Sequence, residues 1–286
     1  MRKNTHEIAR GHRINNKFLL SLREMKNIIF NMSGEPVKGV SGAEILDFSS
    51  LEGTNCYCDA ESAEHLRKAI AGQDSLQRVN WIDTGDYHYI SALTTERIEE
   101  DYILAVFDHH PDMQEPMAEG MLSCGNWARE AFIKQAKPDE GHINRGHMKQ
   151  LLLIGINPEL ELEFLDLIMD EVLAIEENEF RDIKAESFKL SADSRDMIAL
   201  LHKKLPIYIS LDLDVLGKAY ARTNWDQGKM GLDELKCMID VLTKDRELIG
   251  ADICGGLTES KGAVEQDNII NAGTRAELQK YFEKLI

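Results

Sequence analysis

The sequence has no long hydrophobic run. No stretch approaches the roughly 18 apolar residues that a membrane-spanning helix needs, and the opening residues MRKNTHEIARGHRINNKFLL lack the apolar core of a secretory signal. There is also no internal repeat, no low-complexity linker and no proline cluster that would divide the chain. We therefore expect a cytoplasmic protein whose 286 residues include one large domain.

Basic residues are few relative to acidic ones. Lysine and arginine total 33 against 50 aspartates and glutamates, so the formal net charge is -17. A surface with this excess of negative charge repels the phosphate backbone of nucleic acids. We expect small molecules as partners, and neither nucleic acid nor a membrane.

Cysteine is sparse and does not suggest a disulfide framework. The five cysteines are odd in number, widely spread and not in zinc-finger spacing, which predicts free thiols. Cys56 and Cys58 form one C-x-C pair, but a thiolate metal site would need a second pair. We interpret both as partly buried structural residues.

Short apolar runs alternate with helical patterns along the chain. Runs rich in β-branched and aromatic residues predict buried strands at 45–50, 79–83, 102–107, 151–156, 206–211 and 248–253. Charge-faced, helix-periodic stretches lie at 60–72, 91–102, 158–173, 191–205 and 231–245. This alternation predicts a parallel sheet with helices on both faces, a three-layer α/β/α sandwich. We expect one domain over residues 41–286, preceded by an arm of unassigned structure over residues 1–40.

Metal-binding residue types follow two of the predicted strands directly. Ligands of doubly wound sheets bind outside the carboxyl ends of the strands. Asp108, His110 and Asp112 follow the run 102–107, and in an extended chain their side chains would share one side. Asp212 and Asp214 follow the run 206–211 in the same alternation, with Leu213 turned into the core.

A third strand adds an imidazole to the same edge. The glycine-containing turn after residues 79–83 brings His88 to it. The histidine between the first ligands, His109, should point the opposite way and pack within the protein.

The four aspartates require a neutralising charge. Carboxylates that converge at one sheet edge raise one another's pKa unless cations offset them. Two divalent ions would balance the four negative charges, with His88 and His110 as neutral nitrogen ligands. Mixed carboxylate and imidazole ligands favour manganese, with iron, nickel and zinc as alternatives. Two such ions about 3.5 to 4 Å apart would share a water and lower its pKa to give a hydroxide nucleophile, which predicts hydrolysis.

These motifs resemble those of the ureohydrolase family, which includes arginase, agmatinase and formimidoylglutamase. The segments GDYHY (85–89), FDHHPDM (107–113) and SLDLDVL (210–216) are similar to the family's three ligand loops in order and separation, within a matched region from about residue 44 to the C terminus. The resemblance implies an eight-stranded, mostly parallel sheet and commonly a trimer or hexamer. It also implies cleavage of a linear C–N bond in a guanidino or formimino substrate, with release of urea or formamide.

The resemblance assigns a role to each ligand. It implies that one ion is held by His88, Asp108, Asp112 and Asp212, and the other by Asp108, His110, Asp212 and Asp214. Asp108 and Asp212 would then bridge the two ions. Asp112 would also be catalytic, because it would orient the metal-bound hydroxide.

The sequence departs from the family in two segments that bear on the substrate. Residues 123–129 contain no histidine where arginases and agmatinases have a proton shuttle, and we take Asn126 and Arg129 as candidate substrate-binding residues. Arg129 could pair with a substrate carboxylate, or lie on a helix surface. Gly255 stands where the family usually has a glutamate. Glu259 is a candidate replacement, and the alternative is a solvated helix start.

Two other functions remain open. A metal-binding homologue without catalysis, acting as a sensor or assembly subunit, would explain the absent histidine and Gly255. A deacetylase shares the general sheet, but its single zinc and different ligand set argue against it. A dinucleotide-binding protein is excluded because no G-x-G-x-x-G follows the first strand.

Overall fold

A single eight-stranded parallel sheet runs through the molecule. The computed structural model describes residues 26–35, 37–73, 78–136, 147–163, 171–181 and 189–286. In sheet order, the strands are β2 (Ala43–Asp47), β1 (Lys26–Asn31), β4 (Arg78–Ile82), β10 (Leu248–Cys254), β9 (Ile207–Asp212), β5 (Tyr102–Phe107), β7 (Met148–Ile156) and β8 (Val172–Glu176).

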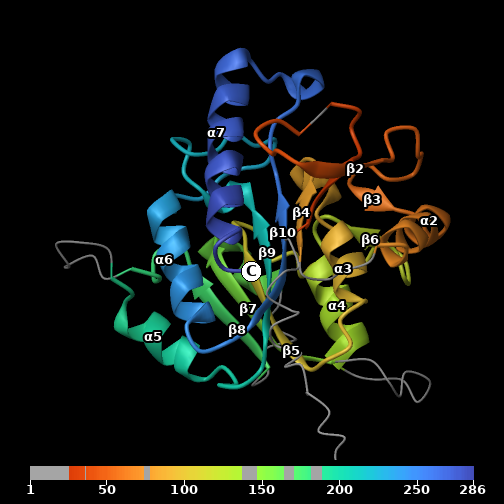
Figure 1. Ribbon diagram of the computed structural model, residues 1–286. Coiled ribbons are helices and arrows are strands. Elements are labelled where there is room, and N and C mark those ends of the chain that lie inside the picture. Colours follow the sequence, from red (N-terminus) through yellow and green to blue (C-terminus); the bar gives the residue numbers. More distant parts are fainter. Residues whose placement is uncertain (1–25, 36, 74–77, 137–146, 164–170, 182–188) are drawn as a thin grey trace, which may run out of the picture.

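Helices cover both faces of this sheet (Figure 1). One face carries α2 (Ala60–Ala71), α3 (Ile90–Thr95) and α4 (Trp127–Ala136), and the other carries α5 (Ala192–Ala199), α6 (Leu232–Thr243) and α7 (Glu265–Phe282). A short antiparallel pair, β3 (Tyr57–Cys58) and β6 (Leu122–Ser123), lies apart from the main sheet. The predicted three-layer α/β/α sandwich is therefore confirmed.

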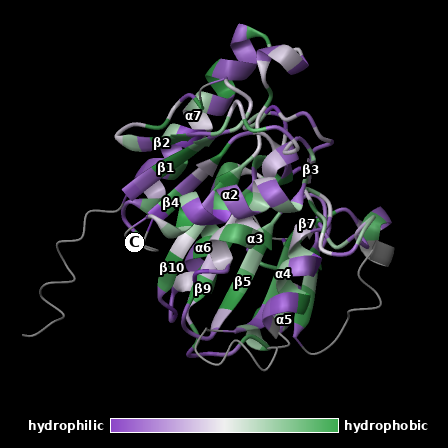
Figure 2. Ribbon diagram, turned by 90° about the vertical axis from the view of Figure 1, so that its right-hand side faces the viewer, coloured by the Kyte–Doolittle hydropathy of each residue, from purple (hydrophilic) through white to green (hydrophobic). Residues whose placement is uncertain are grey.

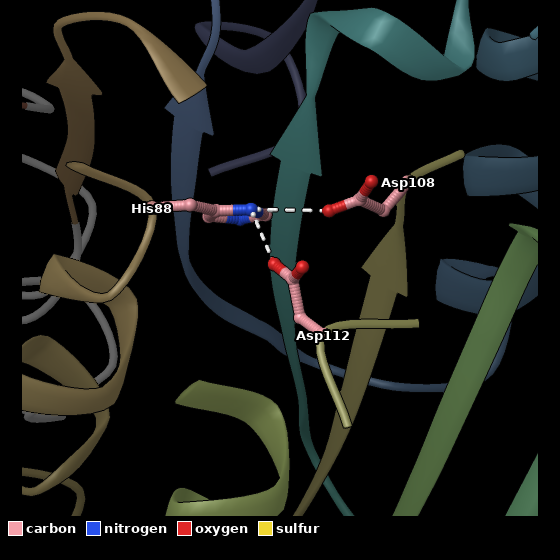
Figure 3. Close-up of side chains that lie close together, drawn as sticks. All are labelled: His88, Asp108 and Asp112. Atoms are coloured by element: carbon pink, nitrogen blue, oxygen red, sulfur yellow. Dashed lines mark ion pairs between the residues drawn. The ribbon is translucent and has the colours of Figure 1, made fainter. Parts of the chain in front are cut away.

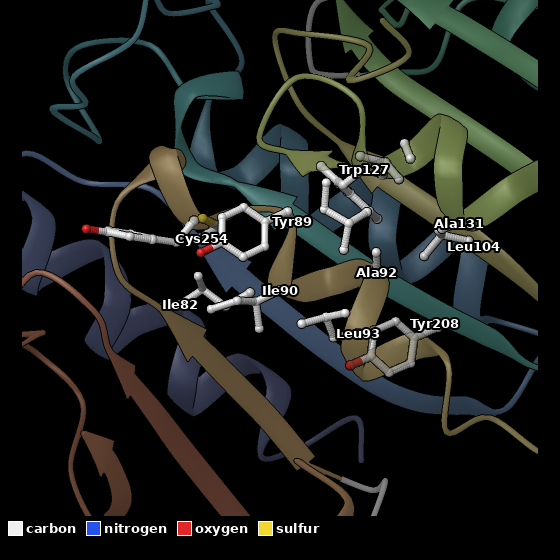
Figure 4. Packing of buried hydrophobic residues seen from close by; sticks show 14 of the residues in the cluster. Ile82, Tyr89, Ile90, Ala92, Leu93, Leu104, Trp127, Ala131, Tyr208 and Cys254 are labelled. Atoms are coloured by element: carbon white, nitrogen blue, oxygen red, sulfur yellow. The ribbon is translucent and has the colours of Figure 1, made fainter. Parts of the chain in front are cut away.

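The central strands are buried on both sides, as their near-continuous apolarity predicts. The prediction of a buried strand at 45–50 is wrong, because β2 lies at the edge of the sheet and none of its residues is buried. All six residues of β5 are buried, and they alternate between two cores. Leu104 and Val106 pack with α2, α3 and α4, whereas Ile103 and Phe107 pack toward α5, α6 and α7. Figure 2 shows the hydrophobic colour concentrated on the central strands. Figure 4 shows the core between the sheet and helices α3 and α4 in detail.

Strand β1 lies inside the segment 1–40, for which the sequence pattern predicts no structure. It pairs in parallel with both β2 and β4. The sheet therefore begins before residue 41, because the short apolar run 28–30 is buried between two neighbouring strands. Residues 1–25 lie outside the described residues.

Two predicted helices differ in the structure. The stretch expected as a helix over 158–173 has a 3-10 turn at Pro158–Glu163 and ends inside β8, and residues 164–170 lie outside the described residues. The helix-like spacing of apolar residues in this stretch continues into Val172 and Leu173, which belong to β8 and pair with β7. The helix expected over 91–102 ends at Thr95, and Tyr102 already belongs to β5.

Among the described residues, no helix is long and apolar enough to span a membrane.

Candidate metal centre

The predicted ligands come together because of the strand order. Strands β4, β10, β9 and β5 are neighbours, and all run in the same direction. Their carboxyl ends therefore lie at one edge of the sheet, where the segments following β4, β5 and β9 meet. Residues that are more than a hundred positions apart, such as His88 and Asp212, come within 3.6 Å of each other.

His88 lies among three carboxylates, and Figure 3 shows it with two of them, Asp108 and Asp112. Its Nδ1 atom is 3.1 Å from Asp108 Oδ2, 3.2 Å from Asp112 Oδ2 and 3.6 Å from Asp212 Oδ2. On the other side of the ring, Nε2 is 2.9 Å from Ser210 Oγ, which itself donates a hydrogen bond to Ser91.

This arrangement fixes the tautomer of the His88 ring. The Ser210 hydroxyl uses its proton toward Ser91, so it accepts the His88 Nε2–H, and the Nδ1 lone pair faces the carboxylates. Nδ1 is buried and has no hydrogen-bond partner among the described residues. A lone pair surrounded by carboxylate oxygens needs a positive species, either a proton or a metal ion.

His110 repeats the arrangement on the other side of Asp108. Its Nδ1 atom is 3.0 Å from Asp214 Oδ2 and 3.5 Å from Asp108 Oδ1, and its Nε2 is 3.0 Å from Asp226 Oδ1. The Asp226 carboxylate accepts the Nε2–H, which again leaves Nδ1 free to bind a cation. Two groups of side chains with the reach to hold a metal ion result: His88 with Asp108 and Asp112, and His110 with Asp108 and Asp214. Asp108 belongs to both.

Asp212 lies beside these groups. Its Oδ1 accepts the backbone N–H of Asp214 at 2.8 Å, and its Oδ2 faces His88. Leu213 between the two aspartates is fully buried in the core, as predicted. The bridging role that the resemblance implies for Asp212 remains a proposal.

The side chains of residues 108, 110 and 112 line one cavity, as predicted, but the chain does not stay extended after β5, so the expected strand-like backbone is wrong. Asp112 has a φ of +51°, in the left-handed region that non-glycine residues rarely adopt. Its carbonyl oxygen accepts the backbone N–H groups of Ala128 and Arg129, and its Oδ2 accepts the Trp127 indole N–H at 2.5 Å. The first turn of α4 therefore holds Asp112 in this conformation and turns its carboxylate toward His88.

Burial and mutual repulsion oppose the simultaneous ionisation of these carboxylates when no counter-charge is present. Burial and the neighbouring Asp108 charge raise the pKa of Asp112 to about 7 and that of Asp212 to about 6. The same causes, with Asp212 added, raise the pKa of Asp214 well above its usual value. Burial lowers the pKa of His88, but its contacts with Asp108 and Asp112 outweigh burial and raise it well above the usual value. The metal-free site therefore takes up protons.

This proton uptake predicts how the metal-free protein responds to pH. Asp112 and Asp212 have raised pKa values in the folded state, so their contribution to stability is full below about pH 4 and is lost as the pH rises through 6 and 7. We expect the urea midpoint of the EDTA-treated protein to fall between pH 4.5 and about 7.5. Manganese should reverse this trend. A midpoint that rises over this range without metal would contradict the assigned electrostatics.

The candidate ligands line a cavity of about 480 Å³. Its other lining residues include Gln114, Glu159, Trp225 and Asp226. None of its lining residues, all from the described part of the chain, is a lysine or arginine. Trp225 and Asp226 carry no signal in the sequence because they lie in an irregular loop after the ligand motif. Only the position of that loop beside His110 marks them.

The three candidate substrate residues do not line this cavity, so the structure gives no support to their predicted role. Both polar atoms of the Asn126 amide are used within their own loop, by Ser123 N–H at 2.7 Å and the Met121 carbonyl at 2.9 Å. Arg129 is buried and lies 3.7 Å from Glu115. Glu259 is exposed beside Lys38 and lines a different cavity.

His109 and the cysteines behave as predicted. His109 is buried with its ring near Glu177 and Asp226, and it belongs to neither metal-binding group. All five cysteines are free thiols. Cys56 and Cys58 join no metal-binding group among the residues that the structure describes.

Gly255 approaches the site so closely that a side chain has no room. It has a φ of +98°, and a Cβ atom would lie 2.5 Å from Asp212 Oδ1 and 2.9 Å from the Leu213 nitrogen. The backbone itself occupies the space beside Asp212. The glutamate that the resemblance leads one to expect at this position cannot be inserted without moving a candidate ligand.

Known proteins resemble this chain in sequence and in fold. Solved structures with a similar fold include formimidoylglutamase from Bacillus subtilis, with 16% identity, a TM-score of 0.60, and 92% of this chain and 88% of that one covered. Arginase from Bacillus caldovelox has 15% identity and a TM-score of 0.60, covering 91% and 98%. Agmatine ureohydrolase from Thermoplasma volcanium has 16% identity and a TM-score of 0.57, covering 91% and 89%.

Sequence comparison places the likeness in the segment that carries the ligands. A curated relative, an uncharacterized protein from Thermotoga maritima, is 24% identical over 177 residues, which cover 62% of this chain and 57% of the relative's length. The model of the Arginase family matches residues 77–255, which span β4 to the start of the turn after β10 and contain all six candidate ligands. The chain therefore belongs to the arginase family.

Proposed function

We propose that the protein is a binuclear-metal hydrolase that cleaves a linear C–N bond of a guanidino or formimino substrate and releases urea or formamide. This proposal rests on one observation. Two clusters that each contain one histidine and two aspartates share Asp108 and line the same cavity. Membership of the arginase family supports it.

The ligand atoms fit a pair of divalent ions. Two imidazole nitrogens, each with its other ring N–H held by a neighbour, face carboxylate oxygens that burial and mutual repulsion leave short of positive charge. We propose that one ion is held by His88, Asp108, Asp112 and Asp212, and the other by Asp108, His110, Asp212 and Asp214. This mixture of oxygen and imidazole ligands favours manganese. When bound, such ions act as Lewis acids and lower the pKa of water toward neutrality.

We propose that Asp112 orients the attacking water. Its Oδ2 atom is fixed by the Trp127 indole N–H and by the contact with His88. The left-handed backbone at residue 112 keeps that carboxylate at the cavity floor.

The rest of the cavity favours a substrate without a carboxylate. Glu159 and Asp226 lie on its wall and Trp225 adds an aromatic face, whereas the lining has no lysine or arginine among the described residues. Acidic and aromatic side chains attract cations, and a substrate carboxylate would find no cationic partner. A guanidino compound with a neutral or amino tail therefore fits better than an amino acid.

A substrate panel tests this proposal. Manganese-loaded protein should release urea from agmatine with a kcat/KM at least about 10-fold above that for arginine or N-formimino-glutamate. Asp112→Asn should lower kcat by about 100-fold or more, whereas Asp193→Asn, at an exposed position on α5, should leave kcat unchanged. If no panel compound yields urea, formamide or ammonia, hydrolysis is the wrong function.

A metal-binding protein without catalysis is the second candidate. The close approach of Gly255 to Asp212 favours it, because no side chain can enter where the family usually has a glutamate. Two bound ions together with a complete lack of turnover would support this candidate.

We also propose that the chain forms a homo-oligomer, a trimer or hexamer, as the resemblance implies. Light scattering during size-exclusion chromatography distinguishes these assemblies from a monomer of 32.4 kDa. A mass near that of one chain would contradict the proposal.

A further inference from the structure

A second cavity lies on the other side of the Gly255–Gly256 turn from the metal centre. It has a volume of about 280 Å³ and is bounded by residues that follow β1, β4 and β10 and by the start of α7. Gly255 faces Asp212, whereas a Cβ atom on Gly256 would lie 2.3 Å from Nη2 of Arg275. The second cavity is therefore separate from the one that contains the candidate metal ligands.

Arg275 is the central residue of this cavity. Its side chain comes from α7, and the residue is 8% exposed. Its one hydrogen bond among the described residues runs from Nη2 to the Gly255 carbonyl oxygen at 2.7 Å. Among the residues that the structure describes, no carboxylate oxygen lies within 4.0 Å of its guanidinium nitrogens. A buried guanidinium with a single hydrogen bond and no ion pair is costly for a folded protein.

Three acidic residues, Glu35, Asp83 and Glu259, also line this cavity. Asp83 Oδ2 accepts the backbone N–H groups of Met32 and Ser33 at 3.0 and 2.7 Å. Glu35 accepts those of Glu259 and Ser260 at 2.6 and 2.9 Å. Burial lowers the pKa of Arg275 to about 10, and the charge of Asp83 offsets this only in part. Arg275 therefore has a charged neighbour in Asp83 but forms no ion pair with it.

Further donors surround the same cavity. Thr84 is buried, and its hydroxyl oxygen has no hydrogen-bond partner among the described residues. The Asn268 side chain lines the wall, and Lys38 lies at the rim, 3.8 Å from the exposed carboxylate of Glu259. A guanidinium fork, a hydroxyl, an amide and a lysine are groups that donate to oxyanions.

We propose that this cavity binds a small oxyanion, a carboxylate or a phosphate, whose charge pairs with Arg275. The bidentate geometry of a guanidinium suits both kinds of oxyanion. The site does not depend on the proposed hydrolysis, because none of its donors is a candidate metal ligand.

Isothermal titration calorimetry on the full-length, manganese-loaded protein tests the proposal. Sodium phosphate and sodium succinate are titrated separately against a sodium chloride control of equal ionic strength. We expect saturable binding of at least one of the two, at one site per chain, and the tighter ligand identifies phosphate or carboxylate chemistry. Arg275→Gln should weaken this binding by about 30-fold or more, and Arg275→Lys by about 5-fold to 10-fold. Absence of saturable binding by either anion would overturn the proposal, as would unchanged affinity in Arg275→Gln.

Two surface variants keep the test decisive if the Arg275 variants do not fold. Glu259→Gln removes a negative charge from the rim at a side chain that is 69% exposed, and should strengthen anion binding by about 2-fold to 5-fold. Lys38→Gln should weaken it by a similar factor. Equal affinities for both variants and the wild type would contradict the site.

The metal centre itself is excluded as the anion's site by one further variant. Asp108→Asn, which should bind no metal, must retain the anion affinity of the wild type. Loss of anion binding in this variant would place the anion on the metal ions and would overturn the proposal for Arg275.

Discussion

Replacing Asp108 by asparagine is expected to remove both metal ions from the protein. Asp108 belongs both to the group with His88 and Asp112 and to the group with His110 and Asp214, with Oδ2 facing His88 and Oδ1 facing His110. Asparagine keeps the shape of the side chain and removes its charge, so each ion would lose an anionic ligand at once. The fall in bound metal should be from about two ions per chain to nearly none. Asp212→Ala should have the same effect if that carboxylate bridges the ions.

Elemental analysis after dialysis measures this loss, and the neighbouring residue provides the control. His109 lies between Asp108 and His110 in the sequence but belongs to neither group, so His109→Asn should retain both ions. His110→Asn should lose one. Full metal retention in Asp108→Asn would show that the shared carboxylate is not a ligand.

Gly255→Ala is expected to destabilise the protein and to disturb the metal centre together. The new Cβ atom would lie 2.5 Å from Asp212 Oδ1, and residue 255 has a φ of +98°. The left-handed backbone alone costs about 1 to 2 kcal/mol for a residue with a Cβ atom. The contact with Asp212 adds a steric term, so the free energy of unfolding should fall by about 3 to 5 kcal/mol. Metal affinity should fall as well, because Asp212 has to move.

Gly262→Ala separates these two contributions. Gly262 has a nearly identical φ of +96°, but a Cβ atom there would meet nothing within 4 Å. It should lose only the backbone term, about 1 to 2 kcal/mol, and keep its metal ions. Chemical denaturation of both variants in parallel gives the comparison. Equal losses of stability in the two variants would mean that Gly255 does not press against Asp212.

The ligand set could be predicted because it depends on local sequence and on one rule of parallel sheets. Each motif directly follows a strongly apolar strand, and the carboxyl ends of parallel strands share an edge. These two facts are enough to place His88, Asp108 and Asp214 at one edge of the sheet. The five central strands β4, β10, β9, β5 and β7 could be recognised for the same reason, since their burial leaves a continuous apolar run.

The local path of the chain could not be predicted in the same way. Asp112 reaches His88 through a left-handed backbone conformation, which depends on hydrogen bonds from the start of α4. The motif D-x-H-x-D does not predict these hydrogen bonds, because their donors lie about fifteen residues further along the chain. The three side chains share one cavity as expected, but not through an extended backbone, because the strand ends at Phe107.

The wall of the cavity at the candidate metal centre could not be predicted either, because contacts between loops that are distant in the sequence form it. Trp225 is held over the site by a hydrogen bond to Asp86, whose second oxygen pairs with Lys261. These three residues come from three separate segments, and only Asp86 belongs to a motif of the sequence, GDYHY. By contrast, Asn126 follows a family motif in the sequence, yet its amide serves its own loop. Sequence position within a motif therefore did not reveal which side chains face the substrate.

The paired metal centre is tested most directly by anomalous scattering at the manganese edge, from crystals grown with millimolar manganese. Two peaks should appear in each chain. One should lie between His88, Asp108 and Asp112, and the other between Asp108, His110 and Asp214. If crystals grown with millimolar manganese show no anomalous peak among these side chains, that result would contradict both the metal centre and the hydrolysis proposed from it.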